Sequence, residues 1–127
     1  MFKSVFLLII SCFLALGKHP GPSMVDVLAA LRKGDAGQLS RHMDDVVRLT
    51  LDERTHPYSK TQSEAILRNF FKTRTIIDLA VVHQSDGEDG EIFVGDLRST
   101  KDRHRVSIIM RTRGDRLVIS ELRLERP

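Results

Sequence analysis

The stretch Tyr58–Phe71 constrains the fold more than any other part of the chain, because it has the pattern of one amphipathic helix. Ser59 is placed to cap its first turn, and Gln62, three residues later, is placed to complete a capping box. Glu64 and Arg68 are spaced for an ion pair on the wet side. The apolar side repeats at helical spacing through Ile66, Leu67, Phe70 and Phe71. Such a helix must pack against a second layer.

Four strand-like segments follow this helix, and they predict what that layer is. Their expected bounds are Ile76–Gln84, Glu91–Ser99, Arg103–Thr112 and Leu117–Glu125. The connections between them are short and rich in glycine or polar residues. Turns of this length join antiparallel neighbours. The chain is therefore expected to be α+β, with helices packed on a curved, mainly antiparallel sheet.

The segments before the helix predict two shorter helices and one strand. Ser23 is expected to cap a helix that runs to Lys33 and stops at Gly34. Asp35 is expected to cap a second helix that runs to about His42. Val46–Leu51 has the alternation of a strand, and 52–57 is expected to be a polar connection that Pro57 ends.

The first 17 residues predict a secretory signal peptide. Lys3 supplies a positive start, Val5–Leu16 is mostly apolar, and Ala15–Gly17 is an acceptable cleavage site. An uncleaved anchor is the alternative, although the apolar run is shorter than the ~20 residues that a spanning helix needs. We therefore expect an exported protein, periplasmic or secreted, with one domain over 18–127 and no membrane span after cleavage. The one cysteine, Cys12, would leave with the signal, so no disulfide is expected.

The charge balance argues against a nucleic-acid-binding protein. The formal net charge is +3 and falls to +2 without Lys3. The distribution is uneven, because residues 85–96 carry five acids and no base, whereas 98–127 carry nine bases and four acids. Pairing between neighbouring strands is the simpler interpretation. A basic strip for an anionic partner is the other.

Four stretches give the chain a resemblance to a known family: Leu31–Asp35, Val47–Leu51, Tyr58–Gln62 with Phe70 and Phe71, and Leu122–Glu125. The chain resembles the cone-shaped nuclear transport factor 2-like (cystatin-like) fold, which ketosteroid isomerase and scytalone dehydratase share. More specifically, it is similar to a domain-of-unknown-function family of small exported bacterial proteins. The resemblance implies this fold and export from a Gram-negative bacterium, and it leaves the function open.

Candidate catalytic groups are sparse. The five histidines are scattered without a close ligand spacing, so neither a metal site nor a cofactor is expected. By analogy with steroid isomerases, a carboxylate should face the cone opposite a tyrosine. Tyr58 is the only tyrosine, and Asp78 and Asp96 are out of phase with the stronger apolar sets of their strands. No catalytic residue is therefore assigned.

The resemblance places a ligand space between the inner sheet face and the long helix. We expect a mostly apolar lining with a few polar groups, which is the usual composition of a small-molecule site. The alternative is that the same side chains fill the core. The tentative lining is Tyr58, Ile66, Phe70, Leu79, Val81, His83, Phe93, Leu97, Ile108, Met110, Ser120 and Leu122.

Three functions stay open on these grounds. The first is a non-catalytic module that binds a small apolar ligand or a peptide. The second is a small isomerase- or dehydratase-type enzyme, and the third is a structural or assembly role at the cell envelope. A homodimer through the sheet is also expected, because the strands carry apolar residues in both phases, with Val82, Ile92, Val94, Ile109 and Ile119 among those in the second.

Overall fold

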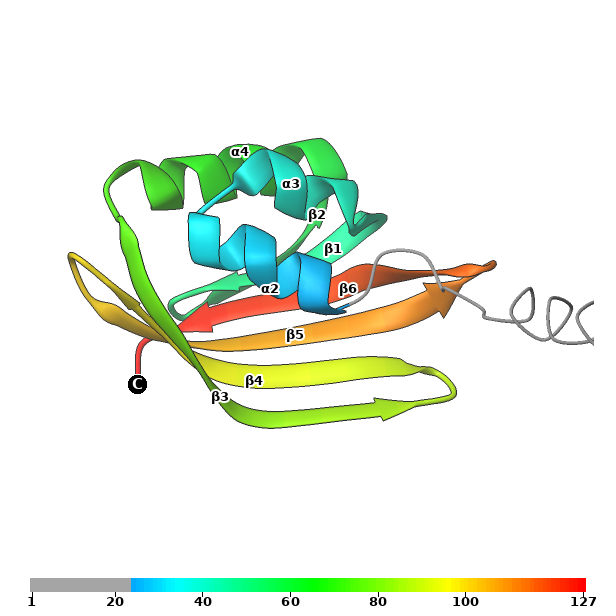
Figure 1. The fold of residues 1–127 in the computed structure, drawn as a ribbon. Coiled ribbons are helices and arrows are strands. Elements are labelled where there is room, and N and C mark those ends of the chain that lie inside the picture. Colours follow the sequence, from blue (N-terminus) through cyan, green and yellow to red (C-terminus); the bar gives the residue numbers. More distant parts are fainter. Residues whose placement is uncertain (1–23) are drawn as a thin grey trace, which may run out of the picture.

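The structure is a computed structural model that describes residues 24–127. The predicted signal peptide over 1–17, the linker after it and the cap at Ser23 lie outside the described residues. Three helices and six strands follow in the order of Figure 1. Their bounds are α2 Met24–Lys33, α3 Ala36–Arg41, β1 Met43–Leu51, β2 Arg54–Ser59, α4 Lys60–Lys72, β3 Ile76–Gly87, β4 Gly90–Ser99, β5 Arg103–Arg113 and β6 Arg116–Glu125.

The six strands form one curved sheet, and the three helices cover one of its faces (Figure 1). The strand order is β2-β1-β6-β5-β4-β3. Every pairing is antiparallel except that between β1 and β6, which is parallel. The last strand in sequence therefore lies in the middle of the sheet, next to the first. The predicted α+β class and the mainly antiparallel sheet are confirmed.

The long helix α4 begins as the sequence predicts. The Ser59 hydroxyl accepts from the Gln62 backbone N–H at 3.1 Å, and the Gln62 side chain accepts from the Ser59 N–H at 3.0 Å. Glu64 and Arg68 form the expected ion pair at 3.0 Å. The buried face consists of Ser63, Leu67, Phe70 and Phe71, and Ile66 is half-buried at its margin.

The expected polar connection over 52–57 is wrong, because most of this stretch is a strand. β2 pairs antiparallel with β1, and Pro57 lies opposite Arg48. Proline is tolerated here because β2 is an edge strand, where an absent N–H leaves no neighbour without its hydrogen bond. The turn before it is tight, and Asp52 adopts a left-handed φ of 56°. β1 also starts earlier than expected, at Met43.

In two strands the alternation of inward- and outward-facing side chains differs from the one that the sequence suggests. In β3 the pairing shifts between Ile76 and Asp78 and again between Val81 and His83. Leu79 and Val81 both precede the second shift and lie on the same face of β3, but only Leu79 is buried, whereas Val81 is 55% exposed. His83 follows the shift and is also exposed. The expectation that Val81 and His83 face the long helix beside Leu79 is therefore wrong. The pairing of β5 with β6 shifts between Ile109 and Met110, which places Ile119 in the core rather than in the outer phase.

We predict that Phe70→Ala or Phe71→Ala lowers the free energy of unfolding by about 3–5 kcal/mol. Both rings are buried, and they contact each other edge to face at 5.4 Å between centroids. Urea denaturation would measure the loss. Val25→Ala in α2, whose side chain is 69% exposed, is the control and should change the value by less than about 0.5 kcal/mol. Wild-type stability in both Phe variants would contradict the packing described here.

Candidate functional site

Four segments that are distant in sequence meet at one end of the sheet, which we call the open end. They are the β1–β2 turn at Asp52, the end of α4 with Arg74, the β4–β5 turn at Asp102, and the chain after β6 at Arg126. All four lie toward the left of Figure 1. Backbone hydrogen bonds join them in two pairs. The Asp52 N–H donates to the Leu124 carbonyl at 2.7 Å, and the Thr100 N–H donates to the Thr75 carbonyl at 3.0 Å.

A chain of charged side chains connects three of these segments. The Arg74 guanidinium donates two hydrogen bonds to the Asp102 carboxylate, at 2.9 and 2.8 Å. Asp102 also lies 3.4 Å from His104 Nδ1, and the other ring nitrogen, Nε2, lies 3.2 Å from the Asp52 carboxylate. The His104 side chain is 1% exposed and Asp52 is 43% exposed. We call Arg74, Asp102, His104 and Asp52 the buried charge chain.

Phe70 holds the buried charge chain against α4. Its ring meets the His104 ring edge to face at 5.1 Å, and the Arg74 guanidinium lies 4.1 Å above it. The contact with Arg74 is a cation–π interaction, because an aromatic face attracts positive charge. The same phenylalanine therefore anchors the helix in the core and orders the polar groups at the open end.

Ionisation follows from this arrangement. The hydrogen bonds from Arg74 hold the pKa of Asp102 well below its usual value of 3.8, at about 2. The same pairing raises the pKa of Arg74. Asp52 is the member of the buried charge chain that reaches the surface.

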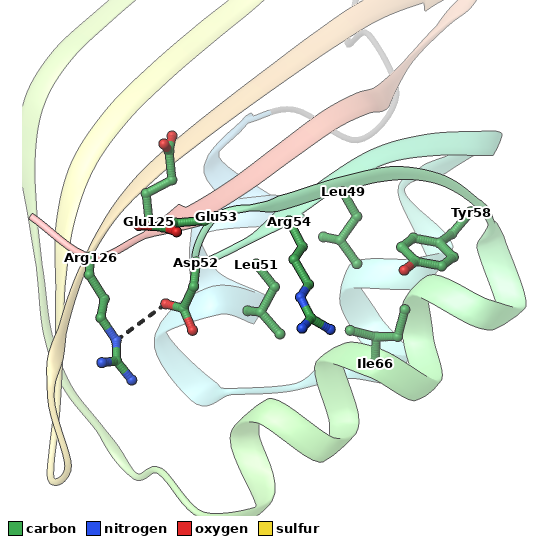
Figure 2. Close-up of a pocket in the computed structure, with 9 residues that line it drawn as sticks. All are labelled: Leu49, Leu51, Asp52, Glu53, Arg54, Tyr58, Ile66, Glu125 and Arg126. Carbon is green, nitrogen blue, oxygen red and sulfur yellow. Dashed lines mark ion pairs between the residues drawn. The ribbon is translucent and has the colours of Figure 1, made fainter.

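A groove opens beside Asp52, between the β1–β2 hairpin and α4 (Figure 2). Its volume is about 830 Å³. Leu49, Leu51, Tyr58 and Ile66 give it an apolar floor, and charged side chains surround that floor. We call this the mouth groove, with the full lining Leu49, Leu51, Asp52, Glu53, Arg54, Tyr58, Ile66, Glu125 and Arg126.

A second hollow continues the mouth groove along α4. The two share Leu51, Asp52 and Ile66, and the second has a volume of about 560 Å³. Its other lining residues are Ala65, Asn69, Phe70, Thr73, Arg74 and Lys101. The depression at the open end is therefore elongated, with Asp52 near its middle.

Charges of both signs line this depression. Arg126 lies 3.4 Å from Asp52, and Figure 2 draws this ion pair as a dashed line. The Arg54 side chain extends from the hairpin toward α4 in the same view. An apolar floor with carboxylates and guanidinium groups around it suits an amphipathic ligand that carries polar ends.

The structure separates the twelve predicted lining residues into groups. Tyr58 and Ile66 line the mouth groove, and Phe70 lines its continuation. Val81 and His83 are exposed on β3. The Ser120 hydroxyl donates to the Ile109 carbonyl at 3.2 Å beside the irregularity in β6. The other six are 0–5% exposed and belong to one contiguous core: Leu79, Phe93, Leu97, Ile108, Met110 and Leu122.

Sequence reasoning missed the groove residues on the hairpin and after β6. Because Pro57 argues against a strand, the sequence analysis assigned Asp52, Glu53 and Arg54 to a connection rather than to the end of a hairpin. The link between Asp52 and His104 spans 52 positions and carries no local signal. Recognising Arg54–Ser59 as an edge strand would have placed Tyr58 and Asp52 on the same hairpin.

Two further findings concern residues 24–127. They contain no cluster of three or more His, Cys, Asp or Glu side chains arranged to hold a metal ion. Within the same range no helix has the length and apolar character needed to cross a membrane.

Helices on one face of a curved six-stranded sheet, with a depression at the open end, define the nuclear transport factor 2-like cone. A designed nuclear transport factor 2-like protein matches with 17% identity, covering 78% of this chain and 90% of that one, at a TM-score of 0.64. The particular family follows from the sequence. The profile described as "Domain of unknown function (DUF4783)" matches residues 24–125, so this chain belongs to that family.

Solved members of the family have the same fold. A DUF4783 protein from Bacteroides ovatus is 23% identical, with coverage of 87% of this chain and 98% of that one and a TM-score of 0.77. One from Bacteroides uniformis is 22% identical, with coverage of 80% and 94% and the same TM-score. The search of curated proteins found no match. These likenesses establish the fold.

We predict that Asp102 makes stability pH-dependent in acid. Folding lowers its pKa from 3.8 to about 2, so its contribution is fully present above 3.8 and is lost as the pH falls towards 2. The wild type should lose about 2 kcal/mol of unfolding free energy by this route. Asp102→Asn should lack this loss, and Asp115→Asn in the exposed β5–β6 turn should keep it. Urea denaturation between pH 5 and 2 measures the difference, and parallel curves for all three proteins would contradict it.

Proposed function

We propose that this chain is a non-catalytic, exported binding module, and that the mouth groove with its continuation along α4 is the binding site. The observation that carries the proposal is the combination of a tightly packed interior with an elongated, apolar-floored depression at the open end. A volume of about 830 Å³ is within the range of ligand sites. The charges around it would fix the orientation of a ligand.

The shape of the site favours an extended, amphipathic ligand. The depression is open along one side of α4, and its floor runs from Tyr58 through Ile66 to Phe70. A peptide segment fits such a surface better than a compact apolar molecule, which would need an enclosed cavity. Arg54 lines the mouth groove and Lys101 lines its continuation, and both would pair with anionic groups of the ligand.

A second candidate function is proton-transfer catalysis at Asp52. The observation in its favour is the contact between this half-exposed carboxylate and the buried His104, which could orient it toward a substrate. The left-handed backbone at Asp52 also belongs to the kind of conformation that recurs at functional sites. A structural role in envelope assembly is a third candidate, and the filled interior supports it.

We predict that the folded protein binds an anilinonaphthalene sulfonate dye saturably and that Ile66→Trp weakens this binding about tenfold or more. The larger ring would occupy the floor between Leu51 and Tyr58, while the core remains intact. Fluorescence titration measures the dissociation constant. Val25→Trp on α2, far from the groove in sequence and 69% exposed, is the matched control and should bind as the wild type does.

The same titration tests the alternatives. A pool of envelope extract should displace the dye, and a displacing compound recovered chemically unchanged supports the binding module. Conversion of that compound by the wild type, but not by Asp52→Asn, would establish the enzyme instead. Equal dye binding by Ile66→Trp, or none by the wild type, would refute the mouth groove as a ligand site.

We further propose that two copies pair through the outer face of the sheet. Ile92 and Ile109 are opposite each other on β4 and β5, with Val94 beside them. Ile92 is 42% exposed, and the other two are half-buried. Near this patch Arg105 is paired with Asp96 at 2.7 Å. Apolar surface of this kind, with a paired polar rim, suits a two-fold interface.

Light scattering at tens of micromolar should therefore return a dimer mass for the wild type and a monomer mass for Ile109→Glu, because two carboxylates would be buried at the centre of the patch. Val46→Glu, in the exposed part of β1, is the control and should remain dimeric. A monomer mass for the wild type would refute the interface.

A further inference from the structure

The strand β3 forms an open edge of the sheet. It is 12 residues long, and only Leu79 in it is buried and only Ile76 half-buried. Figure 1 shows β3 at the lower margin, with no described helix or strand beyond it. An edge strand directs alternate backbone N–H and C=O groups away from the sheet, where another strand can pair with them.

The opposite edge of the sheet, β2, is protected from pairing with another strand, whereas β3 is not. β2 is six residues long and contains Pro57, which has no N–H to offer. The Ser59 N–H in the same strand is already taken by the Gln62 side chain at 3.0 Å. In β3, by contrast, residues 76–87 include no proline, lysine or arginine, which are the usual residues that keep edges from pairing.

Exposed apolar side chains gather at the β3 edge. Within residues 24–127 six large apolar side chains are exposed, and four of these are on β3 and β4: Ile77, Val81, Val82 and Ile92, at 57%, 55%, 51% and 42%. Val82 lies at the irregularity between Val81 and His83 and has no residue opposite it on β4. The middle of the edge therefore offers apolar contacts as well as backbone groups.

The charge of this edge selects the partner. Asp78 and Asp86 lie on the strand, Glu88 and Asp89 lie in the turn after it, and no lysine or arginine occurs from 76 to 97. A second copy paired antiparallel about Val82 would bring Asp78 of one chain opposite Asp86 of the other, and like charges directly opposite are destabilising. A strand with basic residues would be attracted instead.

We propose that β3, over Ile77–His83, is a docking edge for an extended segment of another protein in which basic and apolar residues alternate. The segment adds a strand beside β3, its backbone pairs with the open edge, and its apolar side chains cover Val81 and Val82. Its lysines or arginines face the acidic residues of β3 and the following turn. This site is separate from the mouth groove, since β3 lines neither part of it.

A labelled octapeptide of alternating lysine and valine is the probe, and fluorescence anisotropy with the full chain measures its affinity. We expect saturable binding that salt weakens, and about tenfold weaker binding of the glutamate–valine counterpart. Val82→Lys should weaken binding of the lysine peptide by about tenfold, because it adds a like charge at the apolar centre. Thr55→Lys, which adds the same charge at the β2 edge, should leave it unchanged.

Hydrogen exchange locates the peptide independently of affinity. Alternate backbone amides over 77–83 should exchange more slowly in the complex, while those of β2 should not change. Protection at β2 or at the mouth groove, equal binding of both peptides, or wild-type binding by Val82→Lys would each overturn the proposal. Dimerisation that Val82→Lys abolishes and Ile109→Glu does not would assign the edge to a second copy, which would overturn it as well.

Discussion

The ion pair between Arg74 and Asp102 is the interaction on which the open end depends. It joins the end of α4 to the β4–β5 turn, and through His104 it reaches the β1–β2 turn at Asp52. The Ser99 hydroxyl supports Asp102 from the same turn at 3.2 Å. Breaking such a pair leaves a charge without its partner in a partly buried place, which is costly. The position of the mouth groove follows from this linkage, because its two walls are the segments that the linkage connects.

The interior and the surface of the cone have different roles. Large buried side chains such as Phe93, Leu97 and Ile108 lie under the helices and stabilise the molecule there. The surfaces that we propose for recognition are the depression beside Asp52, the outer sheet face and the β3 edge. They have different chemistry: mixed charges over an apolar floor, a small apolar patch, and an acidic edge with exposed backbone. If all three proposals hold, these surfaces would bind three different kinds of partner.

Local signals in the sequence predicted local structure correctly. Ser59 with Gln62, and Asp35 with Gln38, act within one helical turn, and both caps are present. Non-local features could not be predicted in the same way. The parallel pairing of β1 with β6 joins residues about 70 positions apart in sequence. Neither strand has a local sequence pattern that identifies the other as its neighbour. The irregularity after Val81 moves the rest of β3 by one residue, which reverses the faces that alternation assigns.

The central position of β6 determines when the sheet of this chain can be completed. β1 lies beside β2 on one side and β6 on the other, and β6 comes after all the other strands in the sequence. Until that strand is synthesised, the sheet consists of two separate pieces, the β1–β2 hairpin and the β3–β4–β5 meander, with apolar faces that nothing joins. Closing so long a loop is slow compared with forming a hairpin. The complete sheet can therefore form only when β6 inserts between β1 and β5, and that single step joins the two pieces.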